Sequence, residues 1–388
     1  MQHRLEEDAV VLGLEGSCRL RRVLVRGPNR VNVDRDADGH TPRQRGADRL
    51  DGEAAGRARV DGAGARGSPR LRIGLFDRFV IVDWSASNRP RTGKDSVWIA
   101  DLDATGSLRT QNPATRGRAE VALRSLLRRA VESGERVLVG FDFPFGYPRG
   151  FAAALNLDPP AWWATWRLLS AEIRDSPETN ANNRFEVAAR LNARLGAHAF
   201  WGRPGARALA DLSARRDRVV YRPGNGTSGV AERREVETAV GARGQHPQPV
   251  WKLLGTGSVG SQALTGIPVV ARLREDPLLA GVSAVWPFEV AVPELPPGRA
   301  AVILTEIWPS MIPIPDVDGR VKDELQVLAV ASSYLEQDRT GTLVEAFAAA
   351  PARAGDEEGW ILGVGTSRSV CSHQAPAHTL PDVADGRR

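Results

Sequence analysis

Three apolar segments of the chain each end in a carboxylate. Asp83 follows the residues FVIV, Asp142 follows VLVGF, and Glu306 follows VILT. Short apolar runs of this kind are typical of buried strands, and the ligands of open α/β sheets bind beyond the carboxyl ends of the strands. A fourth acid, Asp323, lies in the first turn of a predicted helix that can pack against the same edge. The sequence therefore predicts that four carboxylates meet in one site.

Clustered carboxylates point to a divalent cation. They repel and raise one another's pKa unless a cation neutralises them. Oxygen ligands without a nearby His or Cys favour Mg²⁺ or Mn²⁺ over zinc. Pairs of such ions serve phosphoryl transfer, in which one ion activates water and the other stabilises the leaving oxygen. A single carboxylate at a strand end more often has a structural role, such as accepting backbone N–H groups, so the prediction depends on convergence of several acids.

The lysines give a second indication of the site. Only three of the 52 Lys plus Arg residues are lysines, namely Lys94, Lys252 and Lys322. A lysine is a compact charge that suits a phosphate contact or the tuning of a neighbouring pKa. Lys322 directly precedes Asp323, so we assign it to the catalytic set, and we assign Lys94 and Lys252 to substrate binding.

Two helices carry further candidates. Glu120 lies near the start of a predicted helix, where an acid in the first turn stabilises the helix dipole; it is also a second-rank candidate for the catalytic set. The segment NNRFEVAARLNARLG reads as an amphipathic helix with a buried apolar face. Its charged residues Arg184 and Glu186 are predicted to line the substrate cleft.

Strands and helices alternate along the part of the chain that must position these residues. The segment 117–134 has the apolar spacing of an amphipathic helix, and a second helix is expected over 321–337. The region of about 149–280 reads as a large helical and loop insertion. This order predicts an α/β fold with one mixed sheet flanked by helices, over residues 73–364. Strands are predicted at 79–84, 95–102, 107–111, 137–142, 284–290 and 300–308.

The two ends of the chain differ in composition from this domain. Residues 1–72 hold fifteen Arg against eleven Asp plus Glu, which leaves +1 of the total net charge of +5 for the rest. We predict that residues 1–72 and 365–388 are disordered, because they lack a core-forming pattern. An extension from an upstream start codon or a nucleic-acid-binding arm would give a similar N-terminal segment. The nearly neutral domain makes the basic pI weak evidence for nucleic-acid binding.

Composition also excludes several classes of protein. No apolar run approaches the 18 or more residues of a transmembrane helix, and the start MQHRLEEDAV carries acids where a signal peptide needs basic and then apolar residues. We therefore expect a cytoplasmic protein without a membrane partner. The only cysteines, Cys18 and Cys371, lie near opposite ends, which argues against a disulfide framework or a thiolate metal site.

Five motifs occur in one order: VDWSAS, GFDFPFGYP, NNRFEVAAR, TEIWPSM and VKDELQVLA. In this order they resemble an uncharacterised family of predicted nucleases with an RNase H-like fold, over roughly residues 79–336. The resemblance implies a metal-dependent phosphodiesterase acting on nucleic acid. It also implies that Asp83, Asp142 and Asp323 are metal ligands with Glu306 beside them, and that Glu120 stands where RNase H-type enzymes carry a catalytic Glu.

Two other classes of function remain open. The glycine-rich segments GNGTSG and GTGSVG would favour actin-like or sugar-kinase-like ATP phosphotransfer, and a non-catalytic protein of cobalamin or molybdenum-cofactor biosynthesis is the third class. GTGSVG also satisfies the dinucleotide-binding pattern, with Glu275 and Asp276 at the distance of a ribose-binding acid. The preceding segment PVWKLL is short for the strand that this motif requires, so we interpret the glycines as a loop that approaches phosphate through backbone amides.

Deletion of residues 1–72 should leave the melting temperature of the protein nearly unchanged. The segment offers too few periodic apolar side chains to offset an ordering entropy of roughly 1 to 2 kcal/mol per residue. Thermal melts of the full chain and of a chain starting at residue 73 test this expectation. A large fall in melting temperature would show that the segment belongs to the fold.

Overall fold

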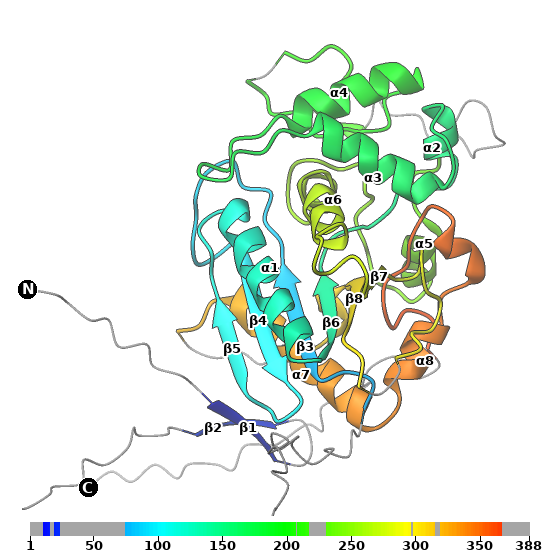
Figure 1. The fold of residues 1–388 in the computed structure, drawn as a ribbon. Coiled ribbons are helices and arrows are strands. Elements are labelled where there is room, and N and C mark those ends of the chain that lie inside the picture. Colours follow the sequence, from blue (N-terminus) through cyan, green and yellow to red (C-terminus); the bar gives the residue numbers. More distant parts are fainter. Residues whose placement is uncertain are drawn as a thin grey trace, which may run out of the picture.

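The computed structural model describes residues 11–15, 19–23, 74–206, 208–216, 230–295, 298–314 and 319–366. Six strands form the central sheet in the order β5-β4-β3-β6-β8-β7 (Figure 1). The strands are β3 (Arg78–Asp83), β4 (Trp98–Asp103), β5 (Leu108–Gln111), β6 (Arg136–Phe141), β7 (Ser283–Val285) and β8 (Ala301–Glu306).

The sheet is mixed, as predicted. β4 pairs antiparallel with β3 and with β5, whereas β3, β6, β8 and β7 run parallel to one another. All six residues of β6 are buried, because this strand lies in the middle of the sheet with helices on both sides. A continuous apolar run such as VLVGF is the pattern expected of a strand buried on both faces. The chain therefore has the α/β class that its sequence predicts.

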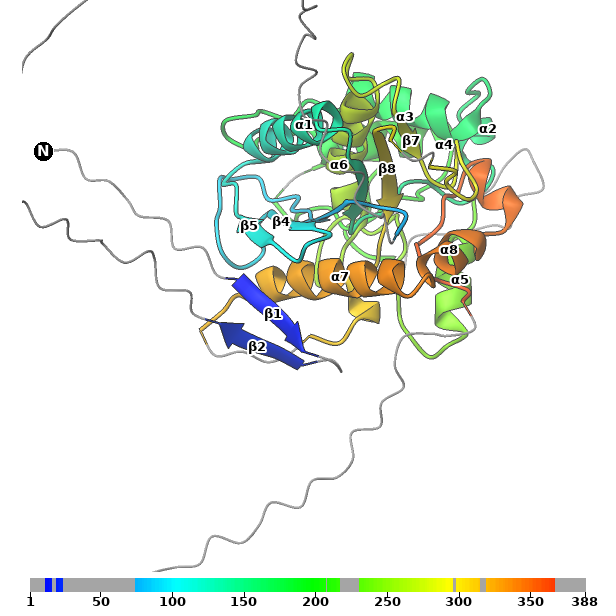
Figure 2. The same cartoon turned by 60° about the horizontal axis from the view of Figure 1, so that its bottom comes forward.

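Helices cover both faces of the sheet. α7 (Lys322–Arg339) lies on one face, and α1 (Arg116–Glu132) and α6 (Gly260–Arg274) lie on the other (Figure 2). Successive side chains of a strand point to opposite faces. Accordingly Val80 and Val82 belong to the apolar cluster of α1 and α6, while Phe79 and Ile81 belong to the cluster of α7. The side chains of odd- and even-numbered residues of β3 thus pack on opposite faces of the sheet.

In the described part of the insertion between β6 and β7, the chain forms five helices. They are α2 (Phe151–Ala154), α3 (Ala161–Glu172), α4 (Arg184–Leu195), α5 (Glu235–Gly241) and α6. Of these helices, the sequence predicted α4 individually but not α6, in which almost every residue is buried. A helix that is apolar on all sides lacks the 3.6-residue alternation by which helices are detected.

The last described part of the chain closes the core beside β8. β7 ends at Val285, well short of the predicted 284–290, because Trp286 leads into Pro287, which has no N–H for ladder pairing. After α7, the short helices α8 (Leu343–Ala348) and η3 (Ala352–Gly355) lead to Leu362, whose N–H donates to the carbonyl oxygen of Glu306 at 3.0 Å. A single turn, η2 (Pro309–Met311), follows β8.

Two short strands lie within the segment for which disorder is predicted. β1 (Val11–Glu15) and β2 (Arg19–Val23) pair antiparallel. The sequence of β1, VLGLE, alternates apolar residues in the manner of a strand. The two strands are thus local structure inside the segment, and its predicted disorder stays a prediction. The rest of residues 1–72, and the predicted C-terminal tail from residue 367, lie outside the described residues.

None of the helices in the described ranges combines the length and the apolar character that crossing a bilayer requires.

Candidate carboxylate site

Asp83 and Asp142 lie together at the carboxyl end of the central sheet. β3 and β6 are parallel neighbours with Val82 opposite Phe141, so the next residue of each strand is an aspartate at the same level. The N–H of Asp142 donates to the carbonyl oxygen of Val82 at 3.3 Å. The two carboxyl groups lie close enough that each acts on the pKa of the other. The predicted convergence of these two acids is therefore present in the structure.

Both oxygens of Asp142 accept hydrogen bonds from fixed donors. Oδ1 accepts from the backbone N–H of Trp84 at 2.7 Å, and Oδ2 accepts from Nε2 of Gln262 at 3.3 Å. Burial raises the pKa of Asp142 to about 7, and these hydrogen bonds partly oppose the rise because they stabilise the ionised form. The Asp142 carboxylate is thus held from both oxygens by neutral groups of the protein.

Asp83 has the more strongly perturbed carboxyl group. Its burial, followed by the negative charges of Asp142, Asp323 and Asp95, raises the pKa of Asp83 well above its usual range. Asp83 and Asp142 nevertheless both keep part of their surface open to solvent. A ligand can therefore reach a pair of acids that are held close together against their mutual repulsion.

α7 brings the third predicted acid to the same end of the sheet. Asp323 is the second residue of α7, and its Oδ2 accepts a hydrogen bond from the N–H of Asp95 at 2.6 Å. Asp95 lies in the loop between β3 and β4 and has a φ of 56°, a left-handed conformation that Asp tolerates better than most residues. The bond to Asp323 fixes this loop against α7, so that both charges act on Asp83.

The sequence analysis missed Asp95 and Gln262. Asp95 follows the singled-out Lys94 directly, so the signal was an acid in a loop that starts from a site strand. Gln262 lies in the undetected helix α6, and a neutral amide in an apolar segment gives no chemical signal on its own. Both residues become visible only when the loop and the insertion are folded against the ends of β3 and β6.

The described acids do not form a ready-made metal site of three or more ligands. Among the residues that the structure describes, no set of three or more His, Cys, Asp and Glu side chains is placed to hold a metal ion. The arrangement is a contacting pair, Asp83 and Asp142, with Asp323 and Asp95 near enough to act on it through their charge. A cation would thus find two carboxylates in direct contact and further negative charge around them.

Glu306 was predicted beside these acids, but the structure pairs it with an arginine. Its Oε1 and Oε2 accept from Nη2 and Nη1 of Arg234, each at 2.7 Å, and Oε2 also accepts from the N–H of Phe145 at 3.0 Å. The reason is strand register. Glu306 stands opposite Phe141, one residue before Asp142, so alternation directs its side chain to the other face of the sheet.

The Glu306–Arg234 pair is the centre of a buried ionic network. Arg234 also binds Oε1 of Glu237 at 3.0 Å and the carbonyl oxygen of Glu358 at 3.0 Å. Arg234 and Glu306 are 1% and 2% exposed, so water cannot replace either partner. This network connects α5, β8 and the last described segment, and we assign Glu306 a structural role in place of the predicted metal ligation.

Glu120 also lies away from the aspartate pair. α1 begins at Arg116, which places Glu120 in its second turn instead of the predicted first turn, on the face of the sheet opposite α7. Its oxygens bind Arg124 at 2.7 Å and Arg272 at 2.6 Å. Burial alone would raise the pKa of Glu120, but the two arginines outweigh it and hold that pKa below its usual range. The residue thus ties α1 to α6.

The charged residues of α4 take two different positions. Arg184 is buried and donates to Oγ of Ser261 at 2.8 Å and to Oδ1 of Asn182 at 2.8 Å, and it also donates to Asn88 in the β3–β4 loop. Glu186 is half-buried in the first turn of α4. Arg184 therefore connects the site loop with α6, whereas its predicted contact with substrate remains a prediction.

The three lysines divide between the site and the insertion. Lys94 and Lys322 are exposed and directly precede Asp95 and Asp323. Lys252 instead donates to the carbonyl oxygen of Thr256 at 2.7 Å and so closes the GTGSVG loop on itself. The first two lysines are thus next to site residues along the chain, and Lys252 has a structural partner in the loop.

The GTGSVG segment does not form a dinucleotide site. GTGSVG leads into α6, but no strand precedes it directly. The pairing of Lys252 with Trp201 is an isolated bridge and does not belong to a strand. Asp276 is held by Arg124 at 2.8 Å and by Arg128 at 2.6 Å, so it is committed to an ionic contact. The second segment, GNGTSG, lies outside the described residues.

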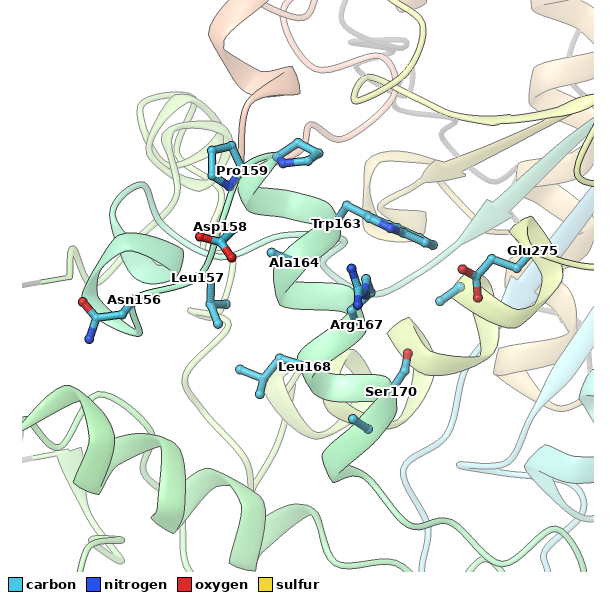
Figure 3. A pocket seen from close by; sticks show the side chains of 13 residues that line it. Asn156, Leu157, Asp158, Pro159, Trp163, Ala164, Arg167, Leu168, Ser170 and Glu275 are labelled. Carbon is cyan, nitrogen blue, oxygen red and sulfur yellow. The ribbon is translucent and has the colours of Figure 1, made fainter.

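A pocket of about 690 Å³ lies elsewhere on the molecule, between α3 and the end of α6 (Figure 3). Trp163, Arg167 and Ser170 line it from α3, and Glu275 lines it from the end of α6. Its size suits a small molecule. Glu275, named above as part of the dinucleotide pattern, is among its lining residues, whereas the acids and lysines assigned from the sequence to the catalytic and substrate-binding sets are not. The chemical argument therefore depends on the aspartate pair.

The chain matches no model of a known protein family, no curated protein and no solved structure. Its function must accordingly be argued from the geometry and charge of the site.

The aspartate pair should make the stability of the metal-free protein depend on pH. The folded-state pKa of Asp142, about 7, is above the unfolded value of about 4, so the folded state binds more protons between these pH values. The free energy of unfolding in EDTA should thus fall as pH rises from about 4 to about 7, by about 1 to 3 kcal/mol after allowance for solvent screening. Asp142→Asn should flatten this slope.

Urea unfolding at a series of pH values measures the effect. Asp103→Asn is the matched control, because hydrogen bonds from Thr105 and Ser107 overcome the effect of burial and lower the pKa of Asp103. That variant should keep the slope of the parent between pH 4 and 7. An Asp142→Asn variant with the same slope as the parent would show that the pair does not share a proton.

Glu306→Gln should destabilise the protein by about 3 to 5 kcal/mol, because it leaves the buried charge of Arg234 without its counter-ion. The loss should be equal in EDTA and in excess Mg²⁺. Glu120→Gln, which weakens a pair at the surface, should cost about 1 kcal/mol or less. A loss that appears only in the presence of Mg²⁺ would restore Glu306 to the metal ligands.

Proposed function

We propose that this chain is a divalent-metal-dependent hydrolase of phosphodiester bonds, with an RNase H-like fold and nucleic acid as its substrate. One observation carries the proposal. Asp83 and Asp142 stand in contact at the carboxyl ends of two neighbouring parallel strands, and both have raised pKa values. Partly open acids with perturbed pKa values at this edge of a sheet are typical of a functional site.

The charge of the site favours a cation. Negative charge is concentrated at one end of the sheet by four acids: Asp83, Asp142, Asp323 and Asp95. A divalent ion would lower the free energy of their ionised forms. Asp83 and Asp142 would hold the ion, with Asp323 binding directly or through water. The oxygen ligands favour Mg²⁺ or Mn²⁺. When bound, such an ion supplies a polarised phosphoryl oxygen and an activated water.

The chain's own groups would orient and attract the substrate. Trp84 and Gln262 hold the Asp142 carboxylate in one orientation, and a fixed carboxylate loses no free energy to reorganisation during the reaction. Lys94 and Lys322 are exposed on segments that carry Asp95 and Asp323. Their positive charges are suited to contact with phosphates next to the scissile bond.

The topology supports the RNase H-like part of the proposal. The chain forms an antiparallel meander of three strands, then α1, then the parallel strand β6, and after the insertion β8 and α7. The motif acids Asp83, Asp142 and Asp323 occur at the ends of β3 and β6 and the start of α7. The motifs VDWSAS, GFDFPFGYP and VKDELQVLA, which carry the resemblance, supply these three acids in the same order. The insertion of about 149–280 is an addition to that plan.

ATP phosphotransfer is the second candidate, and one observation favours it. The GTGSVG loop ends at Gly260, two residues before Gln262, which contacts Asp142. A glycine-rich loop therefore reaches the neighbourhood of the acids, where backbone amides can bind phosphate. Hydrolysis of ATP measured beside cleavage of nucleic acid separates the two activities.

The test is cleavage of single- and double-stranded DNA and RNA in Mg²⁺, Mn²⁺ or EDTA. We expect cleavage that requires the metal and that Asp142→Asn abolishes, because the variant keeps the shape of the side chain while removing the charge that holds the ion. Mg²⁺ should raise the melting temperature of the parent and not that of the variant.

Asp103→Asn serves as control, because Asp103 lies at the other end of β4, away from the site. It should cleave like the parent and show the same shift with Mg²⁺. Cleavage in EDTA, or equal Mg²⁺ shifts for parent and Asp142→Asn, would contradict the proposal. Turnover of ATP without cleavage of nucleic acid would select the second candidate.

A further inference from the structure

The insertion reaches the carboxylate site through one side chain of α6. Nε2 of Gln262 donates to Oδ2 of Asp142 at 3.3 Å and also donates to the carbonyl oxygen of Trp84. The N–H of the same Trp84 donates to Oδ1 of Asp142 at 2.7 Å. The amide of Gln262 has two hydrogens and thus matches the two acceptors. Gln262, Trp84 and Asp142 therefore form a closed set of hydrogen bonds around one carboxylate.

α6 is fixed firmly enough to act as a support. The indole Nε1 of Trp84, a fully buried side chain, donates to Oγ1 of Thr265 one turn after Gln262 at 3.2 Å. Ser261 donates to the carbonyl oxygen of Leu253 at 2.6 Å and accepts from the buried Arg184 at 2.8 Å. The residues on either side of Gln262 are thus tied to the site loop, to α4 and to the start of the GTGSVG loop.

Gln262 is also the exception in its part of the helix. Between Gly260 and Ala271, all residues of α6 except Gln262 are buried. Gln262 keeps part of its surface open to solvent. The open position faces the acids, since its amide contacts Asp142. Packing of an apolar helix does not require a polar side chain at this position. The contact with the Asp142 carboxylate gives Gln262 a role there.

We propose that Gln262 is a positioning residue of the catalytic site, and that α6 makes the insertion part of the catalytic unit. Together with the N–H of Trp84, its amide holds the Asp142 carboxylate in one orientation beside Asp83. Residues that orient a ligand or a catalytic acid commonly matter almost as much as the acid itself. This inference rests on the proposed hydrolase function, and it adds a residue and a whole element to the site.

The test compares Gln262→Leu and Gln262→Glu with the parent in steady-state cleavage of an oligonucleotide. The Leu variant loses the donor, and kcat should fall about 10- to 100-fold with little change in KM, because the substrate still binds. The Glu variant keeps the shape but offers an acceptor at neutral pH. It should lose activity to a similar degree and regain part of it as pH falls, when its protonated carboxyl can donate again.

Arg272→Gln is the matched control on the same helix. Arg272 is exposed in the last turn of α6, where it binds Glu120 of α1, whereas Gln262 lies in the first turn, so this variant should keep the kcat and the pH profile of the parent. If Gln262→Leu is too unstable to assay, the pH profile of Gln262→Glu decides. A Glu variant with the activity and pH profile of the parent would overturn the inference.

A readout without turnover separates this inference from the proposed function. In a crystal structure of Gln262→Leu or Gln262→Glu, the Asp142 carboxylate should rotate from its orientation in the parent. An unchanged Asp142 overturns the positioning role whatever the activity. A parent that shows no metal-dependent cleavage counts against the proposed function, and the orientation of Asp142 then still decides whether Gln262 positions it.

Discussion

The parallel pairing of β3 with β6 is the constraint on which the site depends. With Val82 opposite Phe141, the two strands must deliver their next residues, both aspartates, to the same place. Such proximity of two acids is unfavourable, and the rest of the site offsets it with donors: the backbone N–H of Trp84 and the amide of Gln262. The loop from β3, the helix α6 and the start of α7 are all fixed with reference to this pair. A chain that pairs these strands one residue out of register would bring a valine or a phenylalanine to the same place.

The acids at the strand ends have two different kinds of hydrogen-bond partner. Glu306 receives a buried arginine, both of whose Nη atoms donate to it, and thereby becomes part of the core. Asp142 instead accepts from two neutral donors, the N–H of Trp84 and the amide of Gln262, and the residues Asp83 and Asp142 both remain partly open to solvent. Neutral donors hold a carboxylate in place without cancelling its charge. The charge left uncancelled at the aspartates is what distinguishes a site ready for a cation from a structural ion pair.

Apolar runs and strand-end acids were enough to predict the sheet, α1, α7 and the meeting of Asp83 with Asp142. Local pattern determines these features, because a buried strand is apolar throughout and ends where a polar residue reaches the edge. The fate of Glu306 was not predictable in the same way. It depends on a register difference of one residue and on Arg234, which lies 72 residues away along the chain. Gln262 was missed for a related reason: its role comes from the fold around it, and an amide in an apolar helix carries no pattern of its own.

The ionic network of Arg234 has a consequence for how the chain folds during synthesis. Arg234 is bound by Glu306 and by the carbonyl oxygen of Glu358, which follow it by 72 and 124 residues. Until the ribosome has made the segment around Glu358, the edge of β8 that receives Leu362 stays uncovered, and the guanidinium has only part of its set of acceptors. A contact between such distant residues requires closure of a long loop, which costs conformational entropy before the contact stabilises the fold. Such contacts therefore form slowly. The end of β8, which continues past its partner β7, therefore gains its last backbone partner late in synthesis, and until then this short stretch can pair with a strand of another chain.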